Sequence, residues 1–310
     1  MATQDLKLAL GAPALVLAAS AGAAQIPRFS ARSDLVVLSA TAVNGKGRPV
    51  RDLRSEEFRI FEDGRPQKLE HFSRSTDVPA RILLLVDASG SMNTEAKSTS
   101  ARMAATQILA SLSPEDEVAL AGFDHRYWGI VRFTRDRAAV DKGLEEVAPF
   151  GSTALHDALD RAAHDLASHG EGRRAVVVIT DGVDTASQSA ADEVILRSRA
   201  LDVPIYAISV LSPLDDPASS LFTGRERPSA AVKGLALLDR YAGESGGAAF
   251  AVSDFKALKA ASDQIADELK HQYRIGYEPL EGGGRFRRIE VRSTRKGVVI
   301  RTRSGYVPRS

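Results

Sequence analysis

The amino-acid sequence predicts an α/β protein whose central part is a doubly wound, mostly parallel sheet. Between residues 80 and 271, short apolar runs alternate with segments of helical periodicity, as in sheets whose helices cover both faces. Several runs, such as residues 82–86, are apolar at every position, which is typical of parallel strands buried on both sides. The segments before and after this region have β-type patterns instead. We expect these flanks to form a small second module.

The two flanks carry turn signals that define their strands. In the N-terminal flank, residues 33–75, a turn-like NGKG at residues 44–47 follows the first apolar stretch, and Asp63-Gly64 is a strong hairpin signal. In the C-terminal flank, residues 272–308, three β-type stretches surround a glycine turn. Because a lone hairpin is marginally stable in water, we predict that the flanks pair into one small sheet or sandwich.

The central region supplies the elements of the predicted sheet in a regular order. Apolar stripes predict helices from residue 101 to 112 and from 155 to 166, and further helices surround residues 194–201, 235–241 and 255–269. We expect the strands at residues 82–86, 117–123, 129–133, 175–180, 204–210 and 248–252.

Length and composition exclude several classes of function. The chain has 310 residues, enough for one large domain and a small one. Its net charge of +1 indicates neither nucleic acid nor a membrane surface as a partner. With no cysteine, disulfides, thiolate catalysis and Cys-ligated zinc are excluded.

The N-terminus has the pattern of a signal peptide. Lys7 precedes an apolar stretch, residues 8–24, in which Ala21 and Ala23 fit an A-x-A cleavage site. We therefore predict a signal peptide at residues 1–24 and an exported protein, periplasmic or secreted, with no stable membrane span after cleavage. The alternatives are a retained membrane anchor, for which the stretch is short, and a disordered tail.

Hard oxygen donors follow the predicted strands. Asp87 comes directly after the first central strand, and Ser89 and Ser91 follow at alternate positions. Thr153 lies just before a predicted helix, and Asp181 directly follows another buried strand. Because the carboxyl ends of the strands in an open α/β sheet are the usual ligand-binding edge, we expect these side chains to meet there.

The chemistry of these donors favours a hard cation. Two carboxylates and three hydroxyls, with no His or Cys among them, suit Mg²⁺, or Mn²⁺ or Ca²⁺, rather than zinc or copper. Mg²⁺ keeps several waters and an octahedral shell, so five side chains would not all bind it directly. Hydroxyls on the ion, with carboxylates behind bound waters, would leave one coordination position open to a partner.

These motifs resemble the von Willebrand factor type A domain and its metal-ion-dependent adhesion site. The family pattern is D-x-S-x-S, then a loop Thr, then an Asp in a T-D-G-like turn, and Asp87, Ser89, Ser91, Thr153 and Asp181 fill these positions. The resemblance extends over residues 80–271, and the flanks resemble those of bacterial secreted proteins related to this family. It implies a Rossmann-like sheet, metal-dependent protein binding and no catalysis. We therefore predict a non-enzymatic module whose ion binds an Asp or Glu of a protein partner.

Alternative interpretations of the motif residues remain open. Asp87, Ser89 and Thr153 are also residue types that cap helices. A metal-dependent hydrolase is a second hypothesis, although Ser89 lies in D-A-S-G-S rather than G-x-S-x-G. Of the neighbouring polar residues, we expect His156 on a solvated helix face and Asp184 in a solvated loop.

A third hypothesis is binding to an anionic surface. The C-terminal flank is crowded with basic residues and contains little opposing charge, although the wet face of an antiparallel sheet has the same pattern. The basic residues are Arg285, Arg287, Arg288, Arg292, Arg295, Lys296, Arg301 and Arg303.

Overall fold

The computed structural model describes residues 35–74, 78–170, 172–211, 230–282 and 284–308. These residues lie within one compact unit of the chain. The predicted signal peptide, residues 1–24, lies outside the described residues. Within the described ranges, no helix combines the length and apolar character needed to cross a bilayer.

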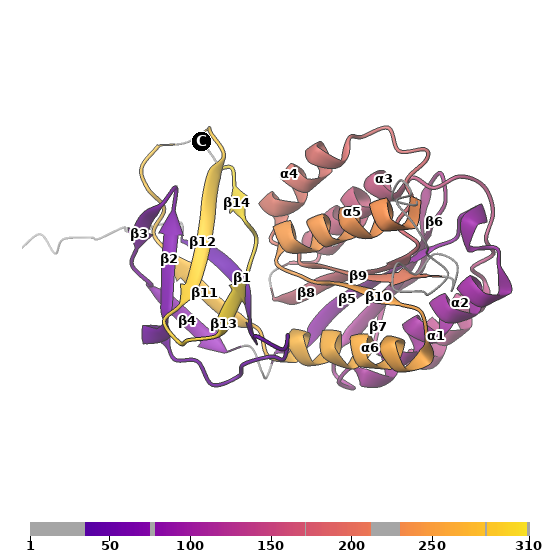
Figure 1. The fold of residues 1–310 in the computed structure, drawn as a ribbon, viewed down its shortest axis with the longest axis horizontal. Helices are drawn as coiled ribbons and strands as arrows, with labels where there is room; N and C mark the ends of the chain where they lie inside the picture. The colour runs from indigo at the N-terminus through magenta and orange to yellow at the C-terminus, as the bar shows by residue number, and fades with distance from the viewer. Residues whose placement is uncertain (1–34, 75–77, 171, 212–229, 283, 309–310) are drawn as a thin grey trace, which may run out of the picture. The chain divides into compact units, whose positions relative to one another are not determined.

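A six-stranded sheet forms the centre of the α/β domain (Figure 1). Its strand order is β10-β9-β8-β5-β6-β7, and every neighbouring pair is parallel except β6 and β7. The predicted fold class, a doubly wound and mostly parallel sheet, is thereby confirmed. The strands are β5 (Ala80–Asp87), β6 (Glu117–Phe123), β7 (Tyr127–Thr134), β8 (Arg173–Thr180), β9 (Ile205–Val210) and β10 (Ala249–Val252).

The antiparallel edge strand β7 follows from the short connection before it. Three residues, 124–126, separate β6 from β7, whereas a parallel neighbour needs a crossover of a dozen or more residues. Gly122 pairs with Trp128 across the two strands. A Cβ atom on Gly122 would lie 2.7 Å from the Trp128 ring, so the glycine makes room for the indole against the sheet.

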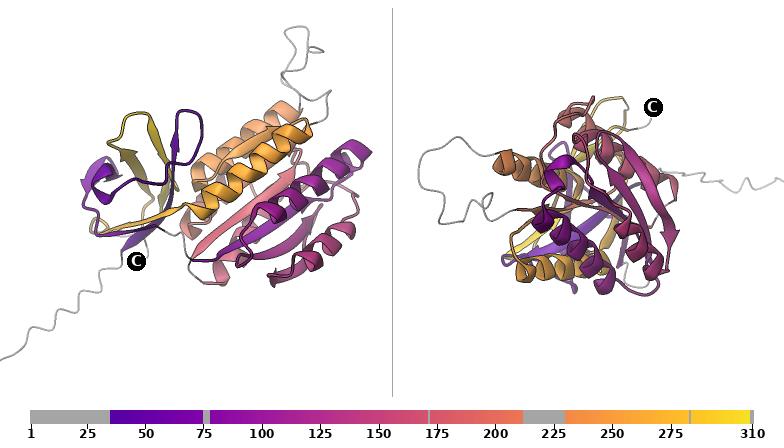
Figure 2. Two further views of the ribbon diagram at one scale, coloured as in Figure 1. Left: turned by 90° about the horizontal axis from the view of Figure 1, so that it is seen from below. Right: turned by 90° about the vertical axis from the view of Figure 1, so that its right-hand side faces the viewer.

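Helices cover both faces of this sheet, as Figure 1 and the two views in Figure 2 show. In β5, Ile82 and Leu84 belong to the core on one face, whereas Leu83 and Leu85 belong to the core on the other. The first face packs against α1 (Glu95–Ser111), α2 (Arg137–Glu145) and α6 (Phe255–Lys270), the second against α3 (Leu155–Ser168), α4 (Ala191–Leu201) and α5 (Ala230–Ser245).

Helix α2 was not predicted from the sequence. It is short, but Asp136 caps it: the side chain accepts hydrogen bonds from the N–H groups of Ala138 and Ala139. Val140 and Leu144 pack into the core one turn apart. An Asp cap followed by an i, i+4 apolar pair is a helix signal, and it was overlooked.

The two flanks of the chain share a β-sandwich. Its sheets have the strand orders β13-β1-β11-β4 and β14-β12-β2-β3. In the first sheet β1 pairs with β11 and β13, and in the second β2 pairs with β12. Each sheet therefore combines strands from both ends of the chain, which are β1 (Val36–Asn44), β2 (Phe58–Glu62), β3 (Arg65–Gln67), β4 (His71–Arg74), β11 (Tyr273–Tyr277), β12 (Arg287–Ser293), β13 (Val298–Arg301) and β14 (Gly305–Tyr306).

The hairpin predicted at Asp63-Gly64 is confirmed. Both residues have positive φ angles, 49° and 78°, as a two-residue hairpin turn of type I′ requires. The turn joins β2 to β3, which pair in antiparallel register. A short 3₁₀ helix, Ser55–Glu57, precedes β2.

Candidate metal centre

Three loops at the carboxyl edge of the central sheet are tied together by hydrogen bonds. In the loop after β5, Gly90 N donates to Gly151 O at 2.8 Å. In the loop before α3, Thr153 N donates to Thr185 Oγ1 at 2.9 Å. Thr153 O also accepts from Thr185 N at 2.8 Å. Since Thr185 belongs to the loop after β8, the donors that we predicted from three separate motifs lie on one interconnected edge.

Asp87 is the last residue of β5 and is buried, with 1% of its surface exposed. Its Oδ1 atom accepts from Ser89 N at 2.8 Å, and its Oδ2 atom accepts from the Thr180 hydroxyl. Burial raises the pKa of Asp87 to about 6, and the nearby charge of Asp181 contributes to the rise, while the hydrogen bonds oppose it. The buried carboxylate is thus held by neutral donors.

The two serines of the motif lie side by side. Ser89 is buried and precedes a short 3₁₀ helix, Gly90–Met92, whereas Ser91 is exposed. Their Oγ atoms are 3.0 Å apart. Within the described residues Ser89 Oγ has no hydrogen bond to a histidine, so the pairing that would activate a serine nucleophile is not formed there.

Asp181 follows β8 directly and is also buried. Val86 pairs with Ile179 in the neighbouring strand, so the ends of β5 and β8 run alongside each other. Asp181 Oδ1 accepts from Val183 N at 3.3 Å, and its Oδ2 lies 3.0 Å from the ammonium of Lys97.

The turn after Asp181 depends on a glycine. Gly182 has a φ angle of +82°, and a Cβ atom there would lie 2.8 Å from the backbone of Gly234 in α5. Only glycine combines this left-handed conformation with such a close approach. The glycine of the T-D-G sequence therefore allows the Asp181 loop to pack closely against α5.

Two residues at this edge were missed by sequence reasoning. Thr180, whose hydroxyl binds Asp87, stands directly before Asp181 in the ITDG sequence, and this position was a usable signal. Lys97 carries no such signal. It lies in the first turn of α1, and its proximity to Asp181 depends on how the intervening loop folds.

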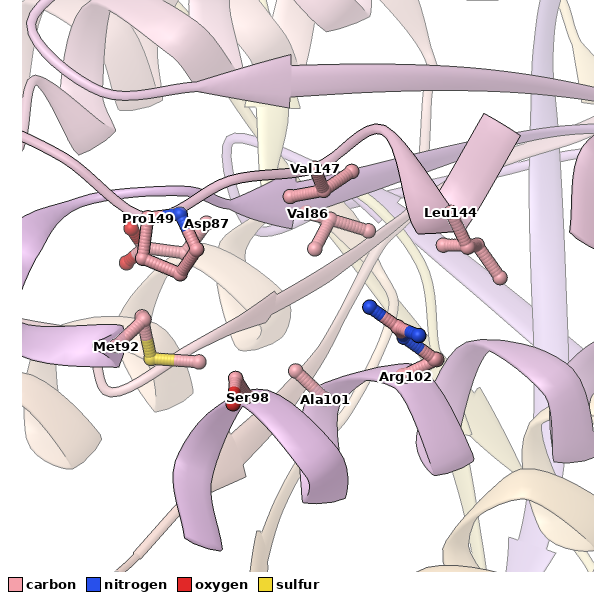
Figure 3. Close-up of a pocket in the computed structure, with 9 residues that line it drawn as sticks. All are labelled: Val86, Asp87, Met92, Ser98, Ala101, Arg102, Leu144, Val147 and Pro149. Atoms are coloured by element: carbon pink, nitrogen blue, oxygen red, sulfur yellow. The ribbon is translucent and has the colours of Figure 1, made fainter. Parts of the chain in front are cut away.

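A small pocket lies beside Asp87 (Figure 3). Its volume is about 30 Å³, far below the roughly 300–1,000 Å³ of pockets that enclose small ligands. It has no room for a small-molecule substrate. The residues that line it are Val86, Asp87, Met92, Ser98, Ala101, Arg102, Leu144, Val147 and Pro149.

The predictions for His156 and Asp184 were wrong. The His156 side chain is 12% exposed, and its ring centroid is 5.9 Å from that of Tyr241. Asp184 accepts from Ser187 Oγ at 2.6 Å and from His156 N at 3.4 Å. The loop after Asp181 folds back over the start of α3, so residues that local periodicity places in solvent are covered by another segment.

The basic C-terminal strands have more carboxylate partners than their own sequence suggested. Arg292 pairs with Glu290, but Arg295 pairs with Glu57, which lies far away in the chain. Six of the eight basic side chains form such pairs: Arg285, Arg287, Arg292, Arg295, Arg301 and Arg303. Acidic residues outside this segment therefore remove most of the unbalanced charge that favoured an anionic surface as a partner.

The residues at the sheet edge fit a hard divalent cation. They supply two buried carboxylates and three hydroxyls, from Ser89, Ser91 and Thr153, and these oxygen donors suit Mg²⁺, Mn²⁺ or Ca²⁺. In the described part of the chain, no group of three or more His, Cys, Asp or Glu side chains is arranged to hold a metal ion. An ion at this edge would therefore depend on hydroxyl ligands as much as on carboxylates.

A doubly wound domain with this motif at its carboxyl edge defines the class of protein, and sequence comparison identifies the family. Residues 82–183 match the family model described as the von Willebrand factor type A domain. The match begins in β5 and ends just after Asp181, so it includes all five motif residues. The chain carries a domain of the von Willebrand factor type A family.

Solved structures match this chain at low sequence identity. A von Willebrand factor type A protein from Catenulispora acidiphila matches with a TM-score of 0.50 and 13% identity, over 88% of this chain and 73% of that chain. This share of the chain is larger than the α/β domain alone. The conserved hypothetical protein BatB from Bacteroides thetaiotaomicron matches with a TM-score of 0.49 and 19% identity, over 62% of this chain and 99% of that one.

Two bacterial relatives match part of the sequence. An uncharacterized protein from Synechocystis sp. is 29% identical over 108 residues, and one from Borreliella burgdorferi is 28% identical over 152 residues. These alignments cover 34% and 46% of this chain, and 26% and 43% of the relatives. The chain thus matches less than half the length of either relative.

Proposed function

We propose that this protein is a non-catalytic binding module of adhesion type that recognises a protein partner through a bound divalent cation. The ion, Mg²⁺ or a similar hard cation, would be held by Asp87, Ser89, Ser91, Thr153 and Asp181. When bound, it supplies a positive centre that accepts an Asp or Glu carboxylate from the partner. The domain itself supplies the rigid edge that positions the ligands.

The observation that carries this proposal is the state of Asp87. A carboxylate that is almost fully buried and accepts hydrogen bonds from neutral groups is costly to keep charged. The negative charge of the neighbouring Asp181 makes the charged form of Asp87 less favourable still. A divalent cation held at this edge would offset both the burial cost of Asp87 and its repulsion by Asp181.

The surroundings of the site support a binding role over catalysis. Within the described residues, the Ser89 hydroxyl pairs with that of Ser91 rather than with a histidine. The three loops are connected to one another by backbone hydrogen bonds and by one bond from Thr153 N to the Thr185 hydroxyl. A braced surface that presents a metal ion suits a partner protein, because little conformational freedom is lost on binding.

Metal binding can be tested with the ion alone. Titration calorimetry with Mn²⁺ should detect one site in the wild-type protein and none in Asp87→Ala. The exposed residue Asp239 in α5 provides the matched control, and Asp239→Ala should bind Mn²⁺ like the wild type. At an Mn²⁺ concentration 100 times its Kd, the ion should stabilise the wild type by about 2.7 kcal/mol. Equal Mn²⁺ binding by wild type and Asp87→Ala would refute the site.

Partner binding is a separate step with its own readout. Capture of envelope proteins on the immobilised protein should be lost in EDTA, be restored by Mg²⁺, and be absent with Asp87→Ala. A glutamate-rich peptide should compete for the captured partner, whereas its glutamine counterpart should not. Capture that survives EDTA, or turnover of a small substrate that depends on the metal, would contradict this function.

We also propose that the protein acts outside the cytoplasm, in the periplasm or after secretion. The support is the apolar stretch at residues 8–24 with its A-x-A pattern. The mature protein from its native host should begin near Ala24 or Gln25, which N-terminal sequencing will test. A cytosolic product that retains residues 1–24 would contradict this proposal.

A further inference from the structure

Lys97 places a positive charge directly against the proposed metal site. Its Nζ atom lies 3.0 Å from Asp181 Oδ2, and the side chains are 13% and 4% exposed. Most ion pairs on a protein surface are screened by water and contribute little. This one is sheltered from solvent, so its attraction is much less screened.

The fold fixes Lys97 in this position through the same connection that carries the serines. The chain runs from β5 through the short 3₁₀ helix into α1, and Lys97 lies in the first turn of that helix. The Thr94 side chain caps the turn by accepting a hydrogen bond from Lys97 N at 3.3 Å. With the backbone anchored, the lysine side chain reaches across to the loop after β8.

Both oxygens of Asp181 are engaged in this arrangement. Oδ1 accepts from Val183 N and Oδ2 accepts from the Lys97 ammonium. A divalent cation would need one of these oxygens as a ligand. A water molecule bound to the cation would need one as a hydrogen-bond acceptor. The ion and the ammonium therefore require the same carboxylate, and as like charges they repel each other.

We propose that Lys97 is a tethered competitor of the divalent cation, and that it sets the affinity of the site for its ion. The proposal rests on the metal site described above. Ion binding must draw the ammonium away from Asp181, and the long, flexible stem of lysine permits this movement without any change in the backbone. The site then fills readily only when the ion is abundant or when a partner carboxylate adds to its binding.

The competition has a measurable consequence for affinity. Mn²⁺ should bind Lys97→Met about tenfold more tightly than the wild type, a change of about 1.4 kcal/mol in binding free energy, because one close and sheltered positive charge is removed. Lys97→Gln keeps a hydrogen-bond donor for Asp181 without the charge, and should shift affinity in the same direction. It also serves if the methionine variant does not fold. The control Lys296→Met removes an exposed charge in the sandwich and should bind like the wild type.

Titration calorimetry of the full-length protein at constant ionic strength distinguishes the outcomes. Equal or weaker Mn²⁺ affinity in both Lys97 variants would overturn the competition while leaving the metal site intact. Absence of binding in the wild type and in both variants would overturn the metal site as well. Binding by the variants with none detectable in the wild type would support the competition in its strongest form.

Discussion

Two buried carboxylates in this protein differ in the charge of their partners. In the sandwich, Glu62 is fully buried, lies 2.7 Å from the guanidinium of Arg287, and also accepts from Tyr306 and from Leu280 N. In the α/β domain, Asp87 is just as buried but accepts from a backbone N–H and a hydroxyl. Glu62 thus has a cationic partner within the fold, whereas the groups that donate hydrogen bonds to Asp87 are neutral.

The difference is that the charge of Glu62 is balanced by a residue of the protein itself, whereas Asp87 has no such partner among its hydrogen-bond donors in the described part of the chain. The chain builds buried ion pairs elsewhere too, as between Arg301 and the fully buried Glu268. The same fold therefore places arginines beside other buried carboxylates, but no arginine donates a hydrogen bond to Asp87 within the described residues. The neutral hydrogen-bond donors of Asp87 are consistent with the divalent cation proposed above.

The largest effect is expected from breaking the sandwich pair. Arg287→Met would leave Glu62 buried without a counter-charge, and should lower the free energy of unfolding by about 3–5 kcal/mol. Urea denaturation measures this difference. The neighbouring Arg288 is exposed, so Arg288→Met should change stability by less than about 0.5 kcal/mol. A small effect of Arg287→Met would show that the pair does not hold the sandwich together.

Removal of the Asp87 charge should have the opposite sign. In EDTA, the pKa of Asp87 is raised by burial to about 6, so the folded state binds a proton more tightly than the unfolded chain. This contribution to stability is complete at low pH and is lost as the pH rises from about 4 through 6. Asp87→Asn should therefore be more stable than the wild type by about 1–3 kcal/mol at pH 7.5.

The pH dependence provides the control for this second prediction. Urea denaturation in EDTA at pH 4, 6 and 7.5 should show the advantage of Asp87→Asn shrinking toward the lowest pH. An advantage that is equally large at pH 4, or a variant less stable than the wild type at pH 7.5, would contradict the contrast between the two carboxylates.

The smallest effect is expected at Thr153. Its hydroxyl is neutral and its backbone is already fixed by Thr185. Thr153→Ala should weaken Mn²⁺ binding by roughly three- to tenfold, the effect of one ordinary hydrogen bond or less. Thr153→Ser keeps the hydroxyl and should bind like the wild type. Calorimetry in which the alanine and serine variants are alike would remove Thr153 from the proposed ligand set.

Local patterns predicted most of the fold because most elements have a single periodicity. Unbroken apolar runs gave β5, β8 and β9, and Asp63-Gly64 gave the hairpin of β2 and β3. Helix α2 was missed because its nine residues carry one apolar pair. The antiparallel direction of β7 followed from a loop length that was visible but not used.

The candidate site was predictable in its residues but not in its surroundings. The D-x-S-x-S pattern and the strand ends predicted five donors, and the structure places them at one edge of the sheet, on loops connected by hydrogen bonds. Contacts between segments far apart in the chain could not be predicted from these local patterns. The ammonium of Lys97 at Asp181, the burial of His156 and the acidic partners of the basic strands all depend on tertiary folding rather than on neighbours in the chain.

The interleaved sandwich imposes an order on biosynthesis. The hydrogen bond from Leu53 N to Tyr273 Oη joins residues 220 positions apart, and the α/β domain lies between them in the chain. As the polypeptide emerges, strands β1 and β2 must wait with open edges until the last segment of the chain has appeared. The α/β domain has local partners and can fold first. During that interval the unpaired strands are the part of the nascent chain most exposed to misassociation, and a chaperone that shields strand edges would have most to protect there.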